Sequence, residues 1–308
     1  MEYILKTYNL TKVFDGKEVV SNVNMNIKKG EIYGFLGPNG AGKTTVMKLI
    51  TNLLKPTVGE IEIFDERLTN TSYEALKRMG TIIETPVFYE KLTGRENLEM
   101  HCDYMGYHNK KTIDEVLKMV NLRGVDQKPV KAFSLGMKQR LGIARAIITK
   151  PELLILDEPI NGLDPMGIKE LRDLFKMLST EYGITILISS HILSEIEQIA
   201  DTIGVINDGK LVKEVSMENI RKSNFEFIEM AVEDTSRATY ILNNKLNISN
   251  FKVMNDNLIR IYNSNITPNK ISETLILNGV SIESITKKES SLEEYFLKLT
   301  KEGGLVNV

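Results

Sequence analysis

The sequence predicts an α/β fold for residues 1–221, followed by a smaller α+β domain at residues 222–308. The first part alternates apolar runs typical of strands with amphipathic runs typical of helices. Two of these runs, at residues 153–156 and 184–188, are continuously apolar, as expected for strands that a sheet buries on both faces. Beyond residue 222 the glycine-dense loops largely stop, and Asn, Ser, Ile and Lys become frequent. This change of composition predicts the domain boundary.

Composition fits a globular protein of about two domains and disfavours several function classes. The 308 residues are 42% hydrophobic, and 39 Lys and Arg are balanced by 41 Asp and Glu, so no basic field favours nucleic acid. The single cysteine, Cys102, excludes an intramolecular disulfide framework and fits a reducing cytosol. The N-terminus lacks a secretory pattern, and no run approaches about 18 uncharged apolar residues. Any membrane role must therefore come through a partner.

The first strand with a chemical motif is the apolar run at residues 32–36. The nine residues that follow fit the phosphate-loop pattern GxxxxGK(S/T): Gly37, Pro38, Asn39, Gly40, Ala41, Gly42, Lys43, Thr44 and Thr45. Glycines let backbone N–H groups surround phosphate oxygens, and the next helix directs the positive end of its dipole at them. That helix is expected from its apolar face, formed by Val46, Met47, Leu49, Ile50, Leu53 and Leu54. The pattern predicts a nucleotide phosphate site.

Two carboxylates supply the second half of the predicted site. Asp157 and Glu158 follow the buried strand at 153–156, at the end where parallel sheets present ligands. We expect Lys43 to reach the β- and γ-phosphates, and Thr44 and Asp157 to hold Mg²⁺. Glu158 is expected to orient or deprotonate the attacking water. The structural alternatives are a glycine-rich turn and a solvated acidic strand end, and the joint occurrence of both motifs disfavours them.

Residues 93–150 read as a helical subdomain inserted into the α/β part. Capping boxes are expected at Thr93 with Glu96 and at Thr112 with Glu115. In the second domain we expect a strand at 225–230, a hairpin at 251–262 that turns at 255–257, a helix near 267–278 and a strand near 280–286. A last helix is expected from Ser291, with an apolar face formed by Leu292, Tyr295, Phe296 and Leu299.

Residues 3–220 resemble the ATP-binding subunit of an ABC transporter, whose core is a P-loop NTPase. The run FSLGMKQR at 133–140 resembles the family signature LSGGQ with its QR tail, and a helix start follows it. The resemblance implies a head-to-tail dimer in which Ser134 and the Gly136 backbone contact the γ-phosphate held by the other subunit. A hydroxyl, a glycine backbone and a helix N-terminus can stabilise the charge of a phosphoryl-transfer transition state.

Three further matches follow the family's order. The run NGLD at 161–164 resembles the D-loop at the dimer seam, which implies that Asp164 lies near the nucleotide. His191 resembles the switch histidine that senses the γ-phosphate, although a single histidine at a strand end is more often structural. Phe14 takes the place of the aromatic residue that stacks on adenine, although an isolated phenylalanine is more often part of a core. The implied cofactors are ATP and Mg²⁺.

Departures from the family pattern point to one branch. Glu84 stands where most relatives have a glutamine that reaches Mg²⁺ and the lytic water, so Glu84 is expected to serve there as a metal and water contact. Leu135 and Met137 replace the usual glycine and glutamine of the signature. With the run at 188–197, these features resemble the bacitracin-exporter and lantibiotic self-protection ATPases of Gram-positive bacteria, and residues 290–296 resemble the tail of such subunits.

The resemblance implies an ATP-hydrolysing subunit of an ABC exporter at the inner face of the cell membrane. Its expected partners are a membrane permease and a second ATPase, identical or paralogous, with no nucleic acid. The segment from Glu84 through about Met105 is expected to contact the permease through an apolar groove. One alternative is a non-transport ABC ATPase that acts on ribosomes or nucleic acid, which the near-neutral charge disfavours. The other is a regulatory ATP-binding scaffold.

Overall fold

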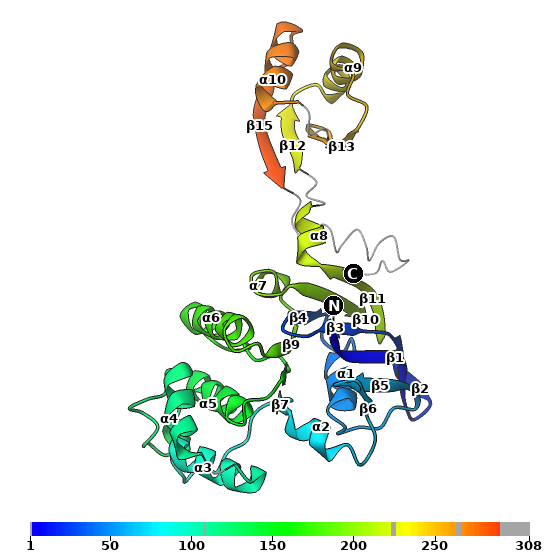
Figure 1. Ribbon diagram of the computed structural model, residues 1–308. Helices are drawn as coiled ribbons and strands as arrows, with labels where there is room; N and C mark the ends of the chain where they lie inside the picture. The colour runs from blue at the N-terminus through cyan, green and yellow to red at the C-terminus, as the bar shows by residue number, and fades with distance from the viewer. Residues whose placement is uncertain (1, 108, 223–225, 263–265, 290–308) are drawn as a thin grey trace. The chain divides into compact units, whose positions relative to one another are not determined.

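The computed structural model describes residues 2–107, 109–222, 226–262 and 266–289. The chain forms two compact units that divide between Met217 and Glu218, and helix α8 (Met217–Lys222) begins at the division. Figure 1 shows the elements of each unit. No helix in the described ranges has both the length and the apolar character needed to cross a bilayer.

The first unit is built on a six-stranded sheet that is buried through its centre. The strand order is β11 (Lys210–Ser216), β10 (Thr202–Asn207), β4 (Ile32–Leu36), β9 (Thr185–Ser190), β8 (Leu153–Leu156) and β7 (Met79–Ile82). All neighbours are parallel except β10 and β11. Every residue of β4, β8 and β9 is buried, which explains why these strands are apolar without alternation. The strands predicted from the apolar runs are confirmed.

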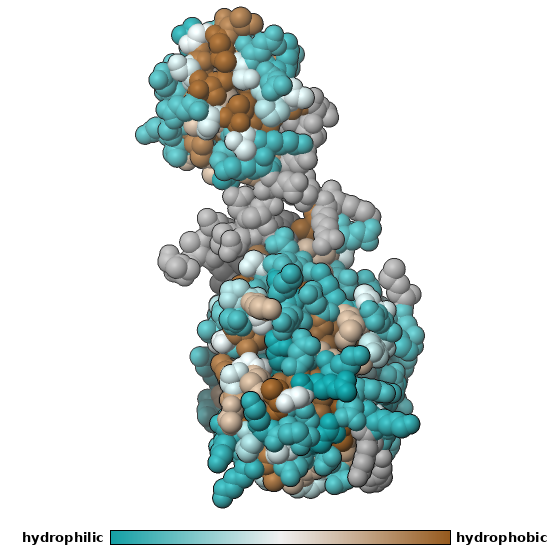
Figure 2. Space-filling view, turned by 90° about the vertical axis from the view of Figure 1, so that its left-hand side faces the viewer, coloured by the Kyte–Doolittle hydropathy of each residue, from teal (hydrophilic) through white to brown (hydrophobic). Residues whose placement is uncertain are grey.

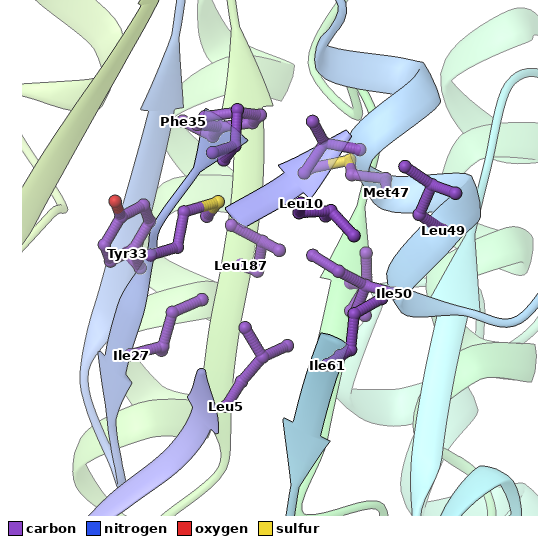
Figure 3. Packing of buried hydrophobic residues seen from close by; sticks show 14 of the residues in the cluster. Leu5, Leu10, Ile27, Tyr33, Phe35, Met47, Leu49, Ile50, Ile61 and Leu187 are labelled. Carbon is purple, nitrogen blue, oxygen red and sulfur yellow. The ribbon is translucent and has the colours of Figure 1, made fainter. Parts of the chain in front are cut away.

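A second, antiparallel sheet and one helix cover one face of the six-stranded sheet. This sheet contains β1 (Tyr3–Phe14), β2 (Lys17–Val23), β3 (Asn26–Lys28), β5 (Val58–Ile63) and β6 (Glu66–Arg67). Its inward side chains meet those of α1 (Lys43–Ile50) and of the central strands in one apolar core, part of which is drawn in Figure 3. Helix α1 is shorter than predicted: it ends at Ile50, and Leu53 lies 65% exposed beyond it.

Helices α6 (Pro165–Thr180) and α7 (Leu193–Ile196) contact the central strands β4 and β9. The close approach of α7 depends on Gly34 of β4, because a Cβ there would lie 2.2 Å from Ile196 Cγ2. The short helix α2 (Tyr73–Lys77) precedes the edge strand β7.

The predicted helical stretch contains α3 (Gly94–Met105), α4 (Lys110–Met119), the 3₁₀ turn η1 (Val130–Ala132) and α5 (Leu135–Ile147). Helix α3 begins with the expected capping box of Thr93 and Glu96. The second expected box is wrong, because Asn109 caps α4 and accepts a hydrogen bond from Lys111 N. Thr112 therefore lies inside the helix, where its hydroxyl is 3.3 Å from that of Tyr107. Asn is among the strongest N-cap residues, so the helix starts there.

The second unit has the order β12 (Glu226–Val232), α9 (Thr235–Leu246), β13 (Phe251–Asn255), β14 (Leu258–Ile261), α10 (Pro268–Leu277) and β15 (Ile282–Glu289). The antiparallel strand order β13-β14-β12-β15 makes this a split βαβ, or ferredoxin-like, arrangement. The hairpin of β13 and β14, helix α10 and the strands β12 and β15 confirm the α+β prediction, and α9 is an element that the sequence patterns missed. The helix expected from Ser291 lies outside the described residues.

A separate apolar core holds this second unit together. It is formed by Ile228, Met230 and Val232 of β12, Ile259 and Ile261 of β14, and residues of both helices. On the face turned to the viewer in Figure 2, apolar residues gather in one patch of this unit, whereas the first unit shows a mainly hydrophilic surface.

Candidate nucleotide site

The candidate phosphate loop joins the end of β4 to the start of α1, and its glycines are required by the backbone. A Cβ at Gly37 would lie 2.3 Å from the carbonyl oxygen of Ile206 in β10. Gly40 and Gly42 have φ values of +81° and +104°, a region that side chains disfavour. Gly42 is also the N-cap of α1, so the loop leads directly into a helix N-terminus. This is the geometry that binds phosphate.

Lys43 places a buried ammonium group inside the loop. The residue is 5% exposed, and its Nζ donates hydrogen bonds to the carbonyl oxygens of Gly37 (2.6 Å) and Pro38 (3.2 Å). The same Nζ lies 3.2 Å from Glu158 Oε1. The two loop carbonyls and the Glu158 carboxylate therefore hold the Lys43 ammonium group inside the phosphate loop, where the motif predicts it.

Asp157 is held by two hydroxyl groups from different elements. Thr44 Oγ1 donates to Asp157 Oδ2 at 2.8 Å, and Ser189 Oγ donates to Asp157 Oδ1 at 2.7 Å. One carboxylate beside a hydroxyl is a donor set of hard oxygens that suits Mg²⁺. Asp157 is 5% exposed, so its charge lies largely shielded from water. The residues at this position therefore fit a magnesium ion.

Glu158 is fixed by contacts on its backbone and on its side chain. Its φ of +48° lies in the left-handed region, which is uncommon for a glutamate. The backbone N–H donates to Ser189 Oγ at 2.8 Å, and Oε2 lies 2.8 Å from His191 Nδ1. Within the described residues, Oε1 accepts no hydrogen bond, although it faces Lys43. The arrangement aims a restrained carboxylate at the phosphate loop.

Ser189 is the residue of this site that the sequence patterns missed. It lies at the end of β9, is fully buried and joins Asp157 and Glu158 through one hydroxyl group. Nearby, the pKa of Glu195 is raised above its ordinary value, mainly by burial; the charges of Arg172 and His191 only partly oppose this. A serine at the end of a buried strand, level with the acidic strand end beside it, is the signal that could have identified Ser189.

Glu84 follows β7 and also has a left-handed backbone, with a φ of +63°. Its side chain is 64% exposed and pairs with Lys48 of α1, with 2.5 Å between Oε1 and Nζ. Within the described ranges, the contacts of Glu84 do not include Thr44 or Asp157. Its role as a metal contact stays a prediction.

The signature and D-loop residues meet at a second location, away from the Lys43 contacts. Ser134 caps α5 by accepting from Met137 N at 3.3 Å, and Asp164 caps α6 by accepting from Gly167 N at 3.1 Å. A cavity of about 550 Å³ is lined by both caps and by Gly136. None of the hydrogen bonds among described residues joins Ser134 to the phosphate loop. Within one chain, the two halves of the predicted site are therefore separate.

Phe14 stands at the end of β1. The residue is 40% exposed, and Lys12 Nζ lies 5.0 Å from the centroid of its ring. An accessible aromatic face of this kind can stack on a nucleobase.

Together, the phosphate loop at a strand–helix turn and the buried acidic strand end beside it define a P-loop nucleotide-hydrolysing protein. The family described as ABC transporter matches residues 20–161. The chain belongs to the ATP-binding proteins of ABC transporters, and it is an ATPase whose hydrolysis of ATP is coupled to transport.

Relatives of the chain match it almost from end to end. The uncharacterized ABC transporter ATP-binding protein YcbN of Bacillus subtilis (strain 168) is 64% identical over 299 residues, which cover 97% of each chain. The bacitracin transport ATP-binding protein BcrA of Bacillus licheniformis is 48% identical over 299 residues, covering 97% of this chain and 98% of the relative. A dimeric post-hydrolysis structure of the ATP-binding cassette MJ0796, bound to ADP and Pi, has a TM-score of 0.63 at 29% identity and covers 69% of this chain and 98% of its own.

Proposed function

We propose that this ATPase powers a separate membrane permease that exports peptide antibiotics such as bacitracin or lantibiotics, and so protects the cell against them. The observation that carries this proposal is the similarity to a bacitracin transport ATP-binding protein over 97% of this chain. A match of that extent includes the second unit, which lies beyond the residues 20–161 matched by the family description.

The site residues divide the work of hydrolysis among them. Lys43 and the loop N–H groups bind the β- and γ-phosphates, and Phe14 stacks on the adenine. Thr44 and Asp157 hold Mg²⁺, with Ser189 orienting Asp157. When bound, Mg²⁺ supplies positive charge against the phosphate oxygens.

Glu158 holds the attacking water, and His191 holds Glu158 through the contact at 2.8 Å. Because the left-handed backbone and the Ser189 hydrogen bond already fix Glu158, little reorganisation is needed when the water binds. We place Glu84 at the edge of this site, as a contact to the water and the metal.

A second ATPase, identical or paralogous, completes each site. Ser134, Gly136 and Asp164 are gathered around one cavity and have no contact to their own phosphate loop among the described hydrogen bonds, so they are placed to serve a nucleotide on another chain. The dimeric cassette that this chain resembles supports such an arrangement.

The permease holds the ATPase at the inner face of the membrane. The permease docks in a groove on the ATPase. Met105 and His101 of α3 line this groove together with residues of α2, β7 and α5. This groove has a volume of about 410 Å³ and includes exposed apolar side chains, as expected for a helix-in-groove contact.

A resistance assay tests the proposal. A strain whose only copy of this gene carries Glu158→Gln should become sensitive to bacitracin or to lantibiotics, and the unaltered gene should restore resistance. Resistance equal to that of the unaltered strain against both classes would refute the antibiotic assignment. Co-purification of the chain with a membrane permease tests the transporter assignment separately.

A further inference from the structure

The docking groove lies between the core of the first unit and its helical stretch. Figure 1 shows the elements that form its walls, α2, β7, α3 and α5. Leu53, Tyr73 and Met105 contribute exposed apolar surface to it, with exposed fractions of 65%, 64% and 38%. Such a surface fits the apolar face of a partner helix.

The charges around this groove have one sign. Lys77, His101 and Arg145 line it, and no aspartate or glutamate does so among the described lining residues. Lys77 is already paired with Glu74, with 2.7 Å between Nζ and Oε1, and both side chains are largely exposed. Arg145 is half-buried whereas Lys77 is exposed, so an opposite charge would stabilise Arg145 more than Lys77.

The side-chain contacts of Arg145 in the described part of the chain are to a backbone carbonyl and to an aromatic ring. Its Nη1 donates to the carbonyl oxygen of Val87 at 2.8 Å, and its guanidinium carbon lies 4.9 Å from the centroid of the Phe88 ring. Within the described part of the chain, it forms no ion pair with a carboxylate, and burial lowers its pKa.

Two other arginines of the same region show the contrast. Arg95 pairs with Asp114 and Asp126, and Arg140 pairs with Glu170. A charge that is removed from water without an opposite charge is costly, and an incoming carboxylate would offset that cost. Arg145 could therefore form an ion pair with a carboxylate that a partner protein brings into the groove.

We propose that Arg145 binds a carboxylate of the permease, carried on a helix whose other contact residues are apolar. The apolar walls of the groove receive the apolar face of that helix, and the guanidinium fixes its register by pairing with one Asp or Glu side chain. His101 also lines this groove, so a carboxylate bound there would lie near both residues. This inference rests on the proposed function, and it specifies the chemistry of the permease segment.

The test uses the detergent-purified complex of the chain with its permease. Arg145→Gln keeps a donor for Val87 and removes the charge, whereas Arg145→Lys keeps the charge. We expect Arg145→Gln to weaken permease binding by about 30-fold or more, and Arg145→Lys to retain most of it. The matched control is Arg67→Gln, because Arg67 is 67% exposed, pairs with Glu60 and does not line the groove. ATP binding by the isolated variants should stay unchanged.

A double-mutant cycle separates a lost contact from a damaged fold. Each cytoplasmic Asp and Glu of the permease is replaced by its amide; one replacement should reproduce the loss seen with Arg145→Gln and add nothing to it in the double variant. Full-strength binding by Arg145→Gln, or additive effects with every acidic position, would overturn the ion pair while leaving the transporter assignment intact. If the unaltered chain binds no permease, the proposed function itself fails.

Discussion

Lys43 Nζ lies 3.2 Å from Glu158 Oε1, which brings the cation of the phosphate loop to the carboxylate that follows β8. The two residues are 115 positions apart in the sequence, and parallel strands bring them together. Both side chains are largely buried, at 6% and 19% exposure. Their contact brings together the two groups that we propose for phosphate binding and water activation.

Removing the charge of Glu158 should separate these two steps. Glu158→Gln is expected to reduce ATP turnover by about 10² or more, because the amide cannot act as a base, while ATP binding remains. Steady-state turnover and nucleotide binding measured on the same sample check this. Lys43→Ala, which should lose binding as well, is the comparison variant. Turnover close to that of the unaltered chain would rule out Glu158 as the water-holding group.

Mixing two inactive variants tests whether one site needs two chains. Lys43→Ala removes the phosphate cation, and Ser134→Arg blocks the exposed N-cap of α5 that should face the second nucleotide. Each variant alone should be inactive, and an equal mixture should regain part of the turnover, because a mixed dimer contains one site with both original residues. An ATPase assay of the mixture decides this, and a mixture as inactive as its components contradicts a shared site.

Ser189→Ala should affect both stability and metal dependence. It leaves Asp157 Oδ1 and the Glu158 N–H without their partner inside a buried region, which costs about 1–3 kcal/mol of unfolding free energy. Because Asp157 also loses an orienting contact, turnover should require more Mg²⁺. Denaturant unfolding and a Mg²⁺ titration measure the two effects. Ser190→Ala is the control, since that hydroxyl contacts only Ile192 among the described residues.

Glu84→Gln should preserve substantial ATPase activity, because an amide oxygen can still contact water or metal. The lost ion pair with Lys48 is solvent-exposed, so unfolding free energy should fall by less than about 1 kcal/mol. Turnover, ATP affinity and the unfolding midpoint are the measurements. Loss of ATP binding would count against the assigned role of Glu84.

His101 should make the first unit less stable in acid. Burial lowers the pKa of His101 below its ordinary value of 6.5, and the charge of Arg145 lowers it further. The unfolded chain therefore binds the proton more readily, so this contribution is complete above about pH 6.5 and is lost as the pH falls toward the folded-state pKa. Urea midpoints measured between about pH 5 and pH 8 should show this slope, and His101→Gln should flatten it. An identical slope in the variant would assign the acid sensitivity to other groups.

Much of the fold could be predicted because its signals are local. The strands at Ile32–Leu36 and Leu153–Leu156 are apolar throughout, and the capping box of Thr93 and Glu96 is a four-residue pattern. Helix α9 escaped prediction because its polar Thr, Ser and Asn residues obscure the few apolar ones, Ala238, Ile241 and Leu242, that the core buries. The end of α1 at Ile50 was also misjudged, since apolar residues continue past it and packing decides which of them the helix includes.

The sequence by itself determined the class of the protein, because GxxxxGK(S/T), the acidic strand end and the signature run are short patterns with a direct chemical meaning. Only the tertiary structure showed that one Ser189 hydroxyl holds both Asp157 and the Glu158 backbone, and that the half-buried Arg145 has no acidic partner among the described residues. The physical reason is that hydrogen bonds and burial depend on distances between residues far apart in the chain. A pattern of residues that are adjacent in the sequence does not specify those distances.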